Sequence, residues 1–141
     1  MQDTPVVFSS IILLLPMMYL FLAAPAFLMV RLDIPPVARL LRAMFNGYFV
    51  ALTVAGIIAT IAVAVTGHPG LALGIGLIAA VSVLSRRWFL LQLDAWIGDR
   101  DTENADAARR LRQLHCGGML ANAVQLMVVV ACVPYFAVVA S

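Results

Sequence analysis

The residues best suited to chemistry form a polar stripe in the C-terminal part of the chain. The stripe consists of His115, Gly118, Asn122, Gln125 and Cys132. Because most of the spacings are three or four residues, these side chains share one face of a helix. Asn and Gln are costly in hydrocarbon, so we expect this face to point into a helix bundle. The stripe predicts either hydrogen bonds that hold helices together or a polar pocket between them.

A charged cluster is the second candidate site, and it consists of Arg86, Arg87, Asp94, Arg112 and His115. Asp94 follows Arg87 at helical spacing, and an ionisable residue at membrane depth is a candidate functional group. We therefore hypothesise that His115 hydrogen-bonds to Asp94 or to a ligand. The alternative is that Arg86, Arg87 and Arg112 contact lipid headgroups, while Asp94 balances one of these charges.

The sequence predicts no cofactor and no metal site. Its two histidines are His68 and His115. We expect them at opposite membrane faces, about 30 Å apart, so one monomer cannot bind a single iron through both. A His–Met site, or two copies of His115 across a dimer, leaves haem or copper open. The sequence has no nucleophile elbow, phosphate loop, CxxC or HExxH motif, so it does not support hydrolysis or phosphoryl transfer.

Membrane-spanning helices must position these residues. The chain of 141 residues is 64% hydrophobic and 11% charged, whereas a soluble domain carries about 25% charged residues. A water-soluble fold of this size could not bury so much apolar surface. The net charge of +2 is too small to indicate a nucleic-acid partner. We therefore expect the lipid bilayer to be the main partner.

Four apolar runs define the expected helices, at about residues 6–30, 43–65, 71–96 and 114–139. The first, second and fourth runs reach the length of about 20 residues that crosses a bilayer. The third is apolar only to Leu84, and we expect its helix to continue past Arg86 and Arg87 to Trp96, with both arginines reaching the lipid headgroups. The turn at 67–70 makes the second and third helices an antiparallel hairpin. The polar segment 98–113 has acidic residues before its arginines, and Asp101 or Thr102 can cap a helix there. The sequence thus predicts one all-α domain, residues 1–141. It is an integral membrane four-helix bundle in up-down-up-down order, with a short amphipathic cytoplasmic helix before helix four.

The distribution of arginine predicts the orientation. Of the nine basic residues, all arginine, three lie between the first two apolar runs and six lie between Arg86 and Arg112. Basic residues accumulate on the cytoplasmic side of membrane proteins. We therefore expect a multi-pass protein of the bacterial cytoplasmic (inner) membrane, with both termini on the non-cytoplasmic side.

Small residues predict close contacts between the second and third helices. Thr53, Gly56 and Thr60 share one face of the second helix, and Gly70 and Gly74 form a G-x-x-x-G pair in the third. Small side chains let the backbones of two helices approach closely.

Three segments carry a family resemblance. They are Leu22-Ala23-Ala24-Pro25-Ala26-Phe27, Met44-Phe45-Asn46-Gly47-Tyr48-Phe49 and Arg110-Leu111-Arg112-Gln113-Leu114-His115, with Asn122 and Gln125 beyond them. Together they resemble an uncharacterised group of small four-helix bacterial membrane proteins. That group is similar to a eukaryotic transmembrane protein associated with platinum-drug resistance and, more distantly, to anthrone-oxygenase-like membrane proteins. The resemblance implies a four-helix bundle and draws attention to His115 and Asn122.

Two main functional hypotheses follow. The first is a non-enzymatic helix-packing module that associates with other membrane subunits as an accessory subunit, or with its own copies as a homo-oligomer. Such a module could hold a lipophilic molecule among its helices. The alternative is a membrane oxidoreductase that acts on a lipophilic substrate, with His115 at the site. A small oligomeric transporter or channel is a third and weaker alternative, because one four-helix chain is small for that role.

Overall fold

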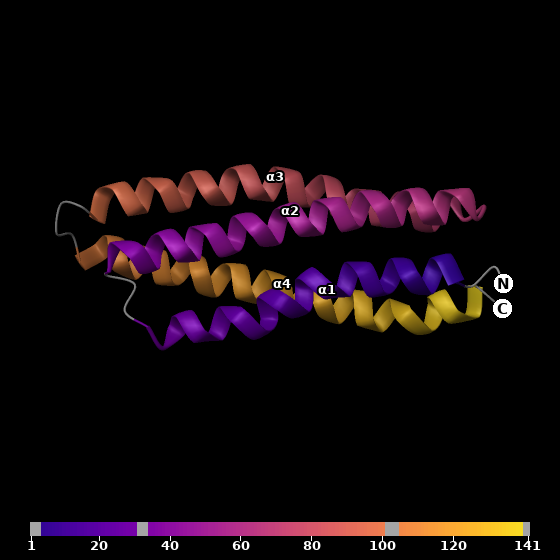
Figure 1. Cartoon of the computed structure of the whole chain (residues 1–141), viewed down its shortest axis with the longest axis horizontal. Coiled ribbons are helices and arrows are strands. Elements are labelled where there is room, and N and C mark those ends of the chain that lie inside the picture. Colours follow the sequence, from indigo (N-terminus) through magenta and orange to yellow (C-terminus); the bar gives the residue numbers. More distant parts are fainter. Residues whose placement is uncertain (1–3, 31–33, 101–104, 140–141) are drawn as a thin grey trace.

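The computed structural model describes residues 4–30, 34–100 and 105–139, and these ranges form four helices and no strand. The helices are α1 (Thr4–Leu28), α2 (Pro35–Val65), α3 (Pro69–Arg100) and α4 (Ala105–Val139). Figure 1 shows them aligned along one long axis. The expected all-α four-helix bundle is therefore the observed architecture.

Each helix contains a segment that is long and apolar enough to cross a membrane. These segments are Val7–Leu28, Pro35–Val65, Pro69–Gly98 and Ala108–Ala131. The outer surface of the bundle carries large apolar side chains, among them Leu22, Leu73 and Met127, which are 70%, 69% and 71% exposed. Water disfavours an apolar surface of this kind, whereas lipid accepts it. The chain is thus a multi-pass membrane protein.

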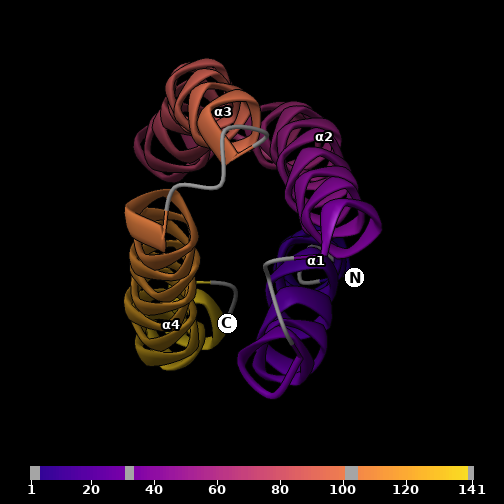
Figure 2. The ribbon, with the colours of Figure 1, turned by 90° about the vertical axis from the view of Figure 1, so that its left-hand side faces the viewer.

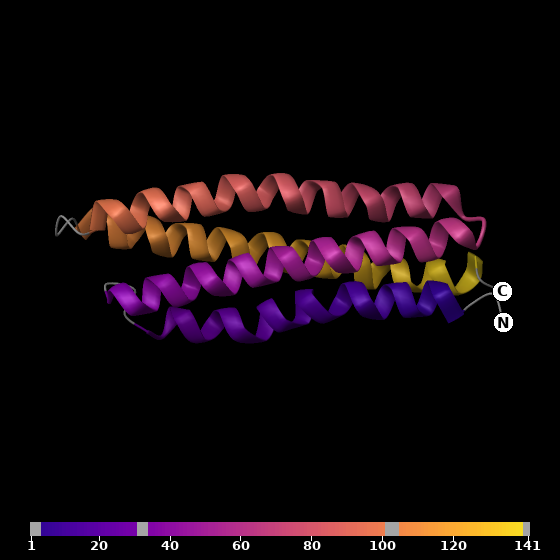
Figure 3. The same cartoon turned by 45° about the horizontal axis from the view of Figure 1, so that its top comes forward.

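The helices form a ring in chain order. α1 packs against α2 and α4, and α3 packs against the same two helices, as the view along the bundle shows (Figure 2). In Figures 1 and 3 the start of α1, the turn between α2 and α3, and the end of α4 lie at one end of the bundle. How this order is inserted in a membrane, and which end faces the cytoplasm, stays a prediction.

The turn between α2 and α3 contains the C-terminal cap of α2. The Gly67 N–H donates to the Ala64 carbonyl at 3.2 Å, and the His68 N–H donates to the Val63 carbonyl at 3.5 Å. This pair of bonds forms a Schellman motif, and Gly67 has the positive φ of 82° that the motif requires. Pro69 then begins α3, a position where its missing N–H costs nothing.

Helix α2 begins earlier than its apolar run indicates. It starts at Pro35, not near Ala43, with prolines in the first two helical positions. Arg39 and Arg42 therefore lie on this helix, although they precede the apolar run. Hydrophobicity does not indicate residues 35–42 as helical, because a helix continues past the hydrocarbon core wherever its backbone hydrogen bonds can form.

The polar segment before the fourth apolar run is continuous with α4, which begins at Ala105. Residues 105–113, which we expected in a short amphipathic helix, form the first turns of α4. The two expected capping residues, Asp101 and Thr102, lie outside the described residues.

The close approach of α2 and α3 depends on Gly56. A Cβ atom added at Gly56 would lie 2.8 Å from the Ala79 Cβ, and one at Gly76 would meet the Thr60 side chain at 3.5 Å. By contrast, Cβ atoms added at Gly70 and Gly74 would meet nothing within 4 Å. The G-x-x-x-G pair is therefore not a helix contact within this chain, because α3 turns its Gly76 and Ala79 face toward α2.

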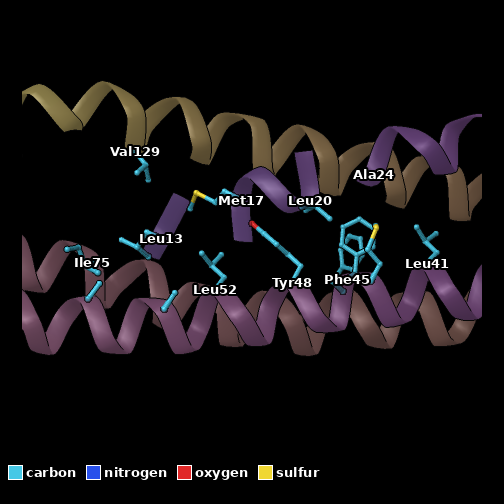
Figure 4. Close-up of a cluster of buried hydrophobic side chains, with 14 of the residues drawn as sticks. Leu13, Met17, Leu20, Ala24, Leu41, Phe45, Tyr48, Leu52, Ile75 and Val129 are labelled. Carbon is cyan, nitrogen blue, oxygen red and sulfur yellow. The ribbon is translucent and has the colours of Figure 1, made fainter. Parts of the chain in front are cut away.

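The interior of the bundle is filled by one apolar cluster to which all four helices contribute. Leu13, Met17 and Leu20 from α1 meet Phe45 and Leu52 from α2 in this cluster (Figure 4). Phe45 is fully buried, and its ring centroid lies 4.6 Å from that of Phe89 on α3. This cluster fixes the inward faces of α2, α3 and α4 and thereby positions their polar side chains.

Candidate ligand-binding cleft

Two polar side chains of α4 donate hydrogen bonds to the backbone of α1. His115 Nε2 lies 2.9 Å from the Ala24 carbonyl oxygen, and Asn122 Nδ2 lies 3.0 Å from the Met17 carbonyl oxygen. The donors are seven residues apart on α4 and the acceptors are seven residues apart on α1, so the two bonds lie two helical turns apart. A carbonyl oxygen only accepts, so His115 Nε2 carries the hydrogen. His115 and Asn122 are 0% and 2% exposed, so these bonds stabilise the contact between α1 and α4.

Tyr48 connects this pair of helices to α2. Its hydroxyl lies 2.9 Å from Asn122 Oδ1 and 3.2 Å from Gln125 Oε1. The hydroxyl has one hydrogen, and Asn122 already presents its amide nitrogen to Met17, so Tyr48 donates to Asn122. Gln125 Oε1, at the longer distance, is the alternative acceptor for the same hydroxyl hydrogen. In Figure 4 the Tyr48 ring extends from α2 into the interior.

A cavity of about 550 Å³ lies beside this network, between α4 and the pair α2 and α3. Its wall combines aromatic rings with polar side chains. The aromatic residues are Phe45, Tyr48, Phe49, Trp88, Phe89 and Trp96. The polar ones are Ser85, Gln92, Arg110, Gln113, Asn122 and Gln125, and Leu114, Gly117, Gly118 and Ala121 complete the lining. We call this cavity the aromatic cleft. Its volume and its mixture of apolar wall and few polar groups are typical of small-molecule sites.

Two further polar contacts tie α2 to α3 toward the end of the bundle where α4 begins. The Arg42 guanidinium pairs with the Asp94 carboxylate through two hydrogen bonds, Nε to Oδ1 and Nη2 to Oδ2, the second at 2.8 Å. Arg86 donates from Nε and Nη2 to Asn46 Oδ1, at 3.0 and 2.8 Å. Both partners of the ion pair are partly exposed, so its contribution to stability is small.

These contacts correct one part of the expected site. The expected hydrogen bond between His115 and Asp94 is wrong, because Asp94 pairs with Arg42 and His115 bonds to α1. The reason is that α4 turns His115 away from α3, while the Asp94 carboxylate reaches a full positive charge on α2. Asp94 does balance an arginine, but the arginine is Arg42 of α2 and not one of the three expected, Arg86, Arg87 and Arg112.

The other predicted residues fall into two sets. Asn122 and Gln125 line the aromatic cleft, whereas His115 is not among its lining residues and bonds to the α1 backbone. Arg87 and Arg112 are exposed, and Arg86 is partly exposed beside Asn46. Contacts of these three arginines with lipid headgroups stay a prediction. The Cys132 side chain lies outside the described residues.

His115 keeps one polar atom without a partner. Nδ1 is buried and has no hydrogen bond, and the rings of Phe27 and Phe45 approach the imidazole edge-on, with centroids 6.0 and 5.7 Å away. Among the residues that the structure describes, no three His, Cys, Asp or Glu side chains come together in a way that could hold a metal ion.

Sequence reasoning missed several residues of the cleft. Tyr48 and Phe45 belong to an aromatic run that reads as ordinary core, and their partners on α4 lie more than 70 residues away in the chain. Arg42 precedes the apolar run at 43–65, so hydrophobicity does not indicate that it lies on the second helix. One usable signal was present: Trp88, Gln92 and Trp96 recur at steps of four residues and share a face of α3.

No family model, no curated protein and no solved structure matches the chain. The resemblance to small four-helix bacterial membrane proteins therefore has no support from these comparisons and stays a hypothesis. The case for a function depends on the geometry of the site.

Proposed function

We propose that this protein binds a lipophilic molecule within the bilayer and acts through binding, not catalysis. The observation that carries the proposal is the aromatic cleft, a cavity of about 550 Å³ between α4 and the pair α2 and α3. Aromatic rings provide apolar contact area, and the amide groups of Gln92 and Gln125 provide hydrogen bonds that can orient a ligand.

The hydrogen bonds of the bundle favour binding over chemistry. Asn122 is occupied by Tyr48 and Met17, and His115 by the Ala24 backbone, so both are already used to hold helices together. His115 is also not among the residues that line the aromatic cleft.

The second candidate is a membrane oxidoreductase with His115 at its site. One observation favours it, namely that Nδ1 of the fully buried His115 lacks a hydrogen-bond partner. A Soret band or stoichiometric metal in the purified protein, lost on His115→Gln with the fold retained, would support this candidate over the first.

We also propose that the protein lies in the bacterial cytoplasmic membrane with its arginine-rich end inside. Five of the seven described basic side chains support this orientation, since they lie within the first eight residues of α2 and α4, which begin at the same end of the bundle. The other two, Arg86 and Arg87, lie near the middle of α3. The test is a fusion at the C-terminus. Alkaline phosphatase should be active there and green fluorescent protein dark, and the reverse result would contradict the orientation.

Native mass spectrometry from mild detergent tests the binding proposal, and the same spectra report any further subunit or second copy. The wild-type chain should carry a lipophilic adduct. Gly117 lines the cleft, and a Cβ added there meets nothing within 4 Å, so Gly117→Leu should fill the cleft and displace the adduct. Gly74→Leu is the matched control, because its Cβ also meets nothing within 4 Å and lies away from the cleft. Equal adducts on both variants would contradict the proposal.

A further inference from the structure

A second, polar cavity adjoins the aromatic cleft. Its volume is about 460 Å³, and it is lined by Trp96, Asp106, Arg109, Arg110 and Gln113. Three of these residues, Trp96, Arg110 and Gln113, also line the aromatic cleft. The two cavities therefore share a wall and form one amphipathic site, with an aromatic part between the helices and a charged part at the first turns of α4.

The charged part of the site favours an anion. Among the residues that the structure describes, its lining carries two guanidinium groups against one carboxylate, that of Asp106. The Arg110 guanidinium carbon lies 5.6 Å from the centre of the Trp96 ring, so the aromatic face holds this cation at the boundary between the two cavities. A guanidinium stacked in this way keeps N–H groups at its edge, which can bind the oxygens of a phosphate in pairs.

On the premise of the proposed function, we infer that the ligand is an acidic phospholipid with a single negative charge. Its phosphate lies between Arg109, Arg110 and Gln113, and one acyl chain extends past Trp96 into the aromatic cleft. A single charge fits better than two, because the Asp106 carboxylate is part of the same wall. A bilayer lipid fits better than a soluble anion, because the polar cavity shares three lining residues with the aromatic cleft, where an acyl chain can lie.

Tryptophan fluorescence tests this inference, because the two tryptophans of the chain, Trp88 and Trp96, both line the aromatic cleft. The full chain in a neutral detergent is titrated with phosphatidylglycerol or phosphatidylcholine carrying the same brominated acyl chains, which quench tryptophan. Inorganic phosphate is added as a separate competitor. We expect saturable quenching by both lipids, with phosphatidylglycerol binding about threefold to fivefold more tightly, the upper part of the range of an exposed charge pair.

Two variants locate the preference. Arg110→Gln should abolish the difference between the two lipids, and Arg110→Lys should restore part of it, because lysine keeps the charge. Arg112→Gln removes an exposed arginine that lines neither cavity, and it should keep the full preference.

The possible failures are distinguishable. Equal affinity for both lipids in the wild-type chain would overturn the acidic headgroup and leave the proposed function standing. Displacement of phosphatidylglycerol by inorganic phosphate would show a site for a free anion, which also overturns the inference. The absence of any saturable quenching would contradict the proposed function itself.

Discussion

Replacing Gly118 with alanine should destabilise the bundle, although alanine is the better helix former. A Cβ atom at this position would lie 2.7 Å from Phe45 Cε1, 2.9 Å from Phe45 Cζ and 3.1 Å from Phe89 Cζ. Phe45 is fully buried and packs against Phe89, so neither ring can move away without disturbing the core. Overpacking of this kind costs about 1–3 kcal/mol.

The neighbouring glycine provides the matched control. At Gly117 an added Cβ meets nothing within 4 Å, so Gly117→Ala gains about 1 kcal/mol of helix propensity without a clash. Since Gly118→Ala gains the same propensity, the difference between the two variants measures the clash alone.

Equilibrium unfolding in mixed micelles provides the assay, with helix content by circular dichroism as the signal. Gly118→Ala should be less stable than Gly117→Ala by about 1–3 kcal/mol. In a Phe45→Leu background, Gly118→Ala should cost less stability than it does in the wild-type chain, because the smaller leucine side chain leaves space beside the new methyl group. Equal stability of the two single variants would refute the packing described for Gly118.

Three further predictions concern contacts between helices. In a double-mutant cycle, Tyr48→Phe and Asn122→Ala should couple by about 0.6 kcal/mol, and by no more than about 1.7 kcal/mol, because they share a buried hydrogen bond between helices. Arg42→Gln and Asp94→Asn should each cost less than about 1 kcal/mol, since the ion pair is partly exposed. Gly56→Ala should lower the free energy of unfolding by about 1–3 kcal/mol, because the added Cβ lies 2.8 Å from the Ala79 Cβ. The Ala79 Cβ is attached to the backbone and cannot rotate away.

The same unfolding assay serves all three predictions. Tyr19→Phe is the control for the tyrosine, because Tyr19 is 56% exposed, and it should leave stability unchanged. Gly74→Ala is the control for Gly56. Additive effects of the Tyr48 and Asn122 substitutions would contradict their hydrogen bond. A loss of stability well above about 1 kcal/mol in Arg42→Gln would contradict the weak ion pair. Equal stability of Gly56→Ala and Gly74→Ala would contradict the close approach at Gly56.

The membrane fold could be predicted from the sequence because each membrane-spanning helix is recognisable from its own residues. A run of apolar residues can be recognised without knowing its neighbours, and the 67–70 turn carries its own glycines and proline. The start of α2 was less accessible, since Pro35, Pro36 and two arginines resemble a loop in composition although their backbone is helical. The position at which a helix ends outside the hydrocarbon core depends on its backbone hydrogen bonds, and the hydrophobicity of the residues does not indicate where these bonds stop.

The site was only partly predictable because its contacts join distant segments. The spacing of His115, Asn122 and Gln125 indicated one polar face of α4, but not which helix would receive each side chain. Tyr48 meets Asn122 across 74 residues of chain, and spacing within one helix contains no information about such a partner. The cleft itself exists only where the aromatic faces of α2 and α3 meet the small residues of α4.

The most direct test of the cleft is photocrosslinking with a lipid that carries a diazirine in its acyl chain, followed by mass-spectrometric mapping of the labelled residues. We expect labelling to be concentrated on cleft residues such as Trp88, Gly117 and Ala121, and to be lost when unlabelled lipid is in excess. The lipid-facing Ile57 and Ile61 of α2, 50% and 59% exposed, should be labelled weakly and without competition. Labelling that follows exposure alone, equally strong on Ile57 and Ile61 and insensitive to competitor, would contradict the existence of a specific lipid site.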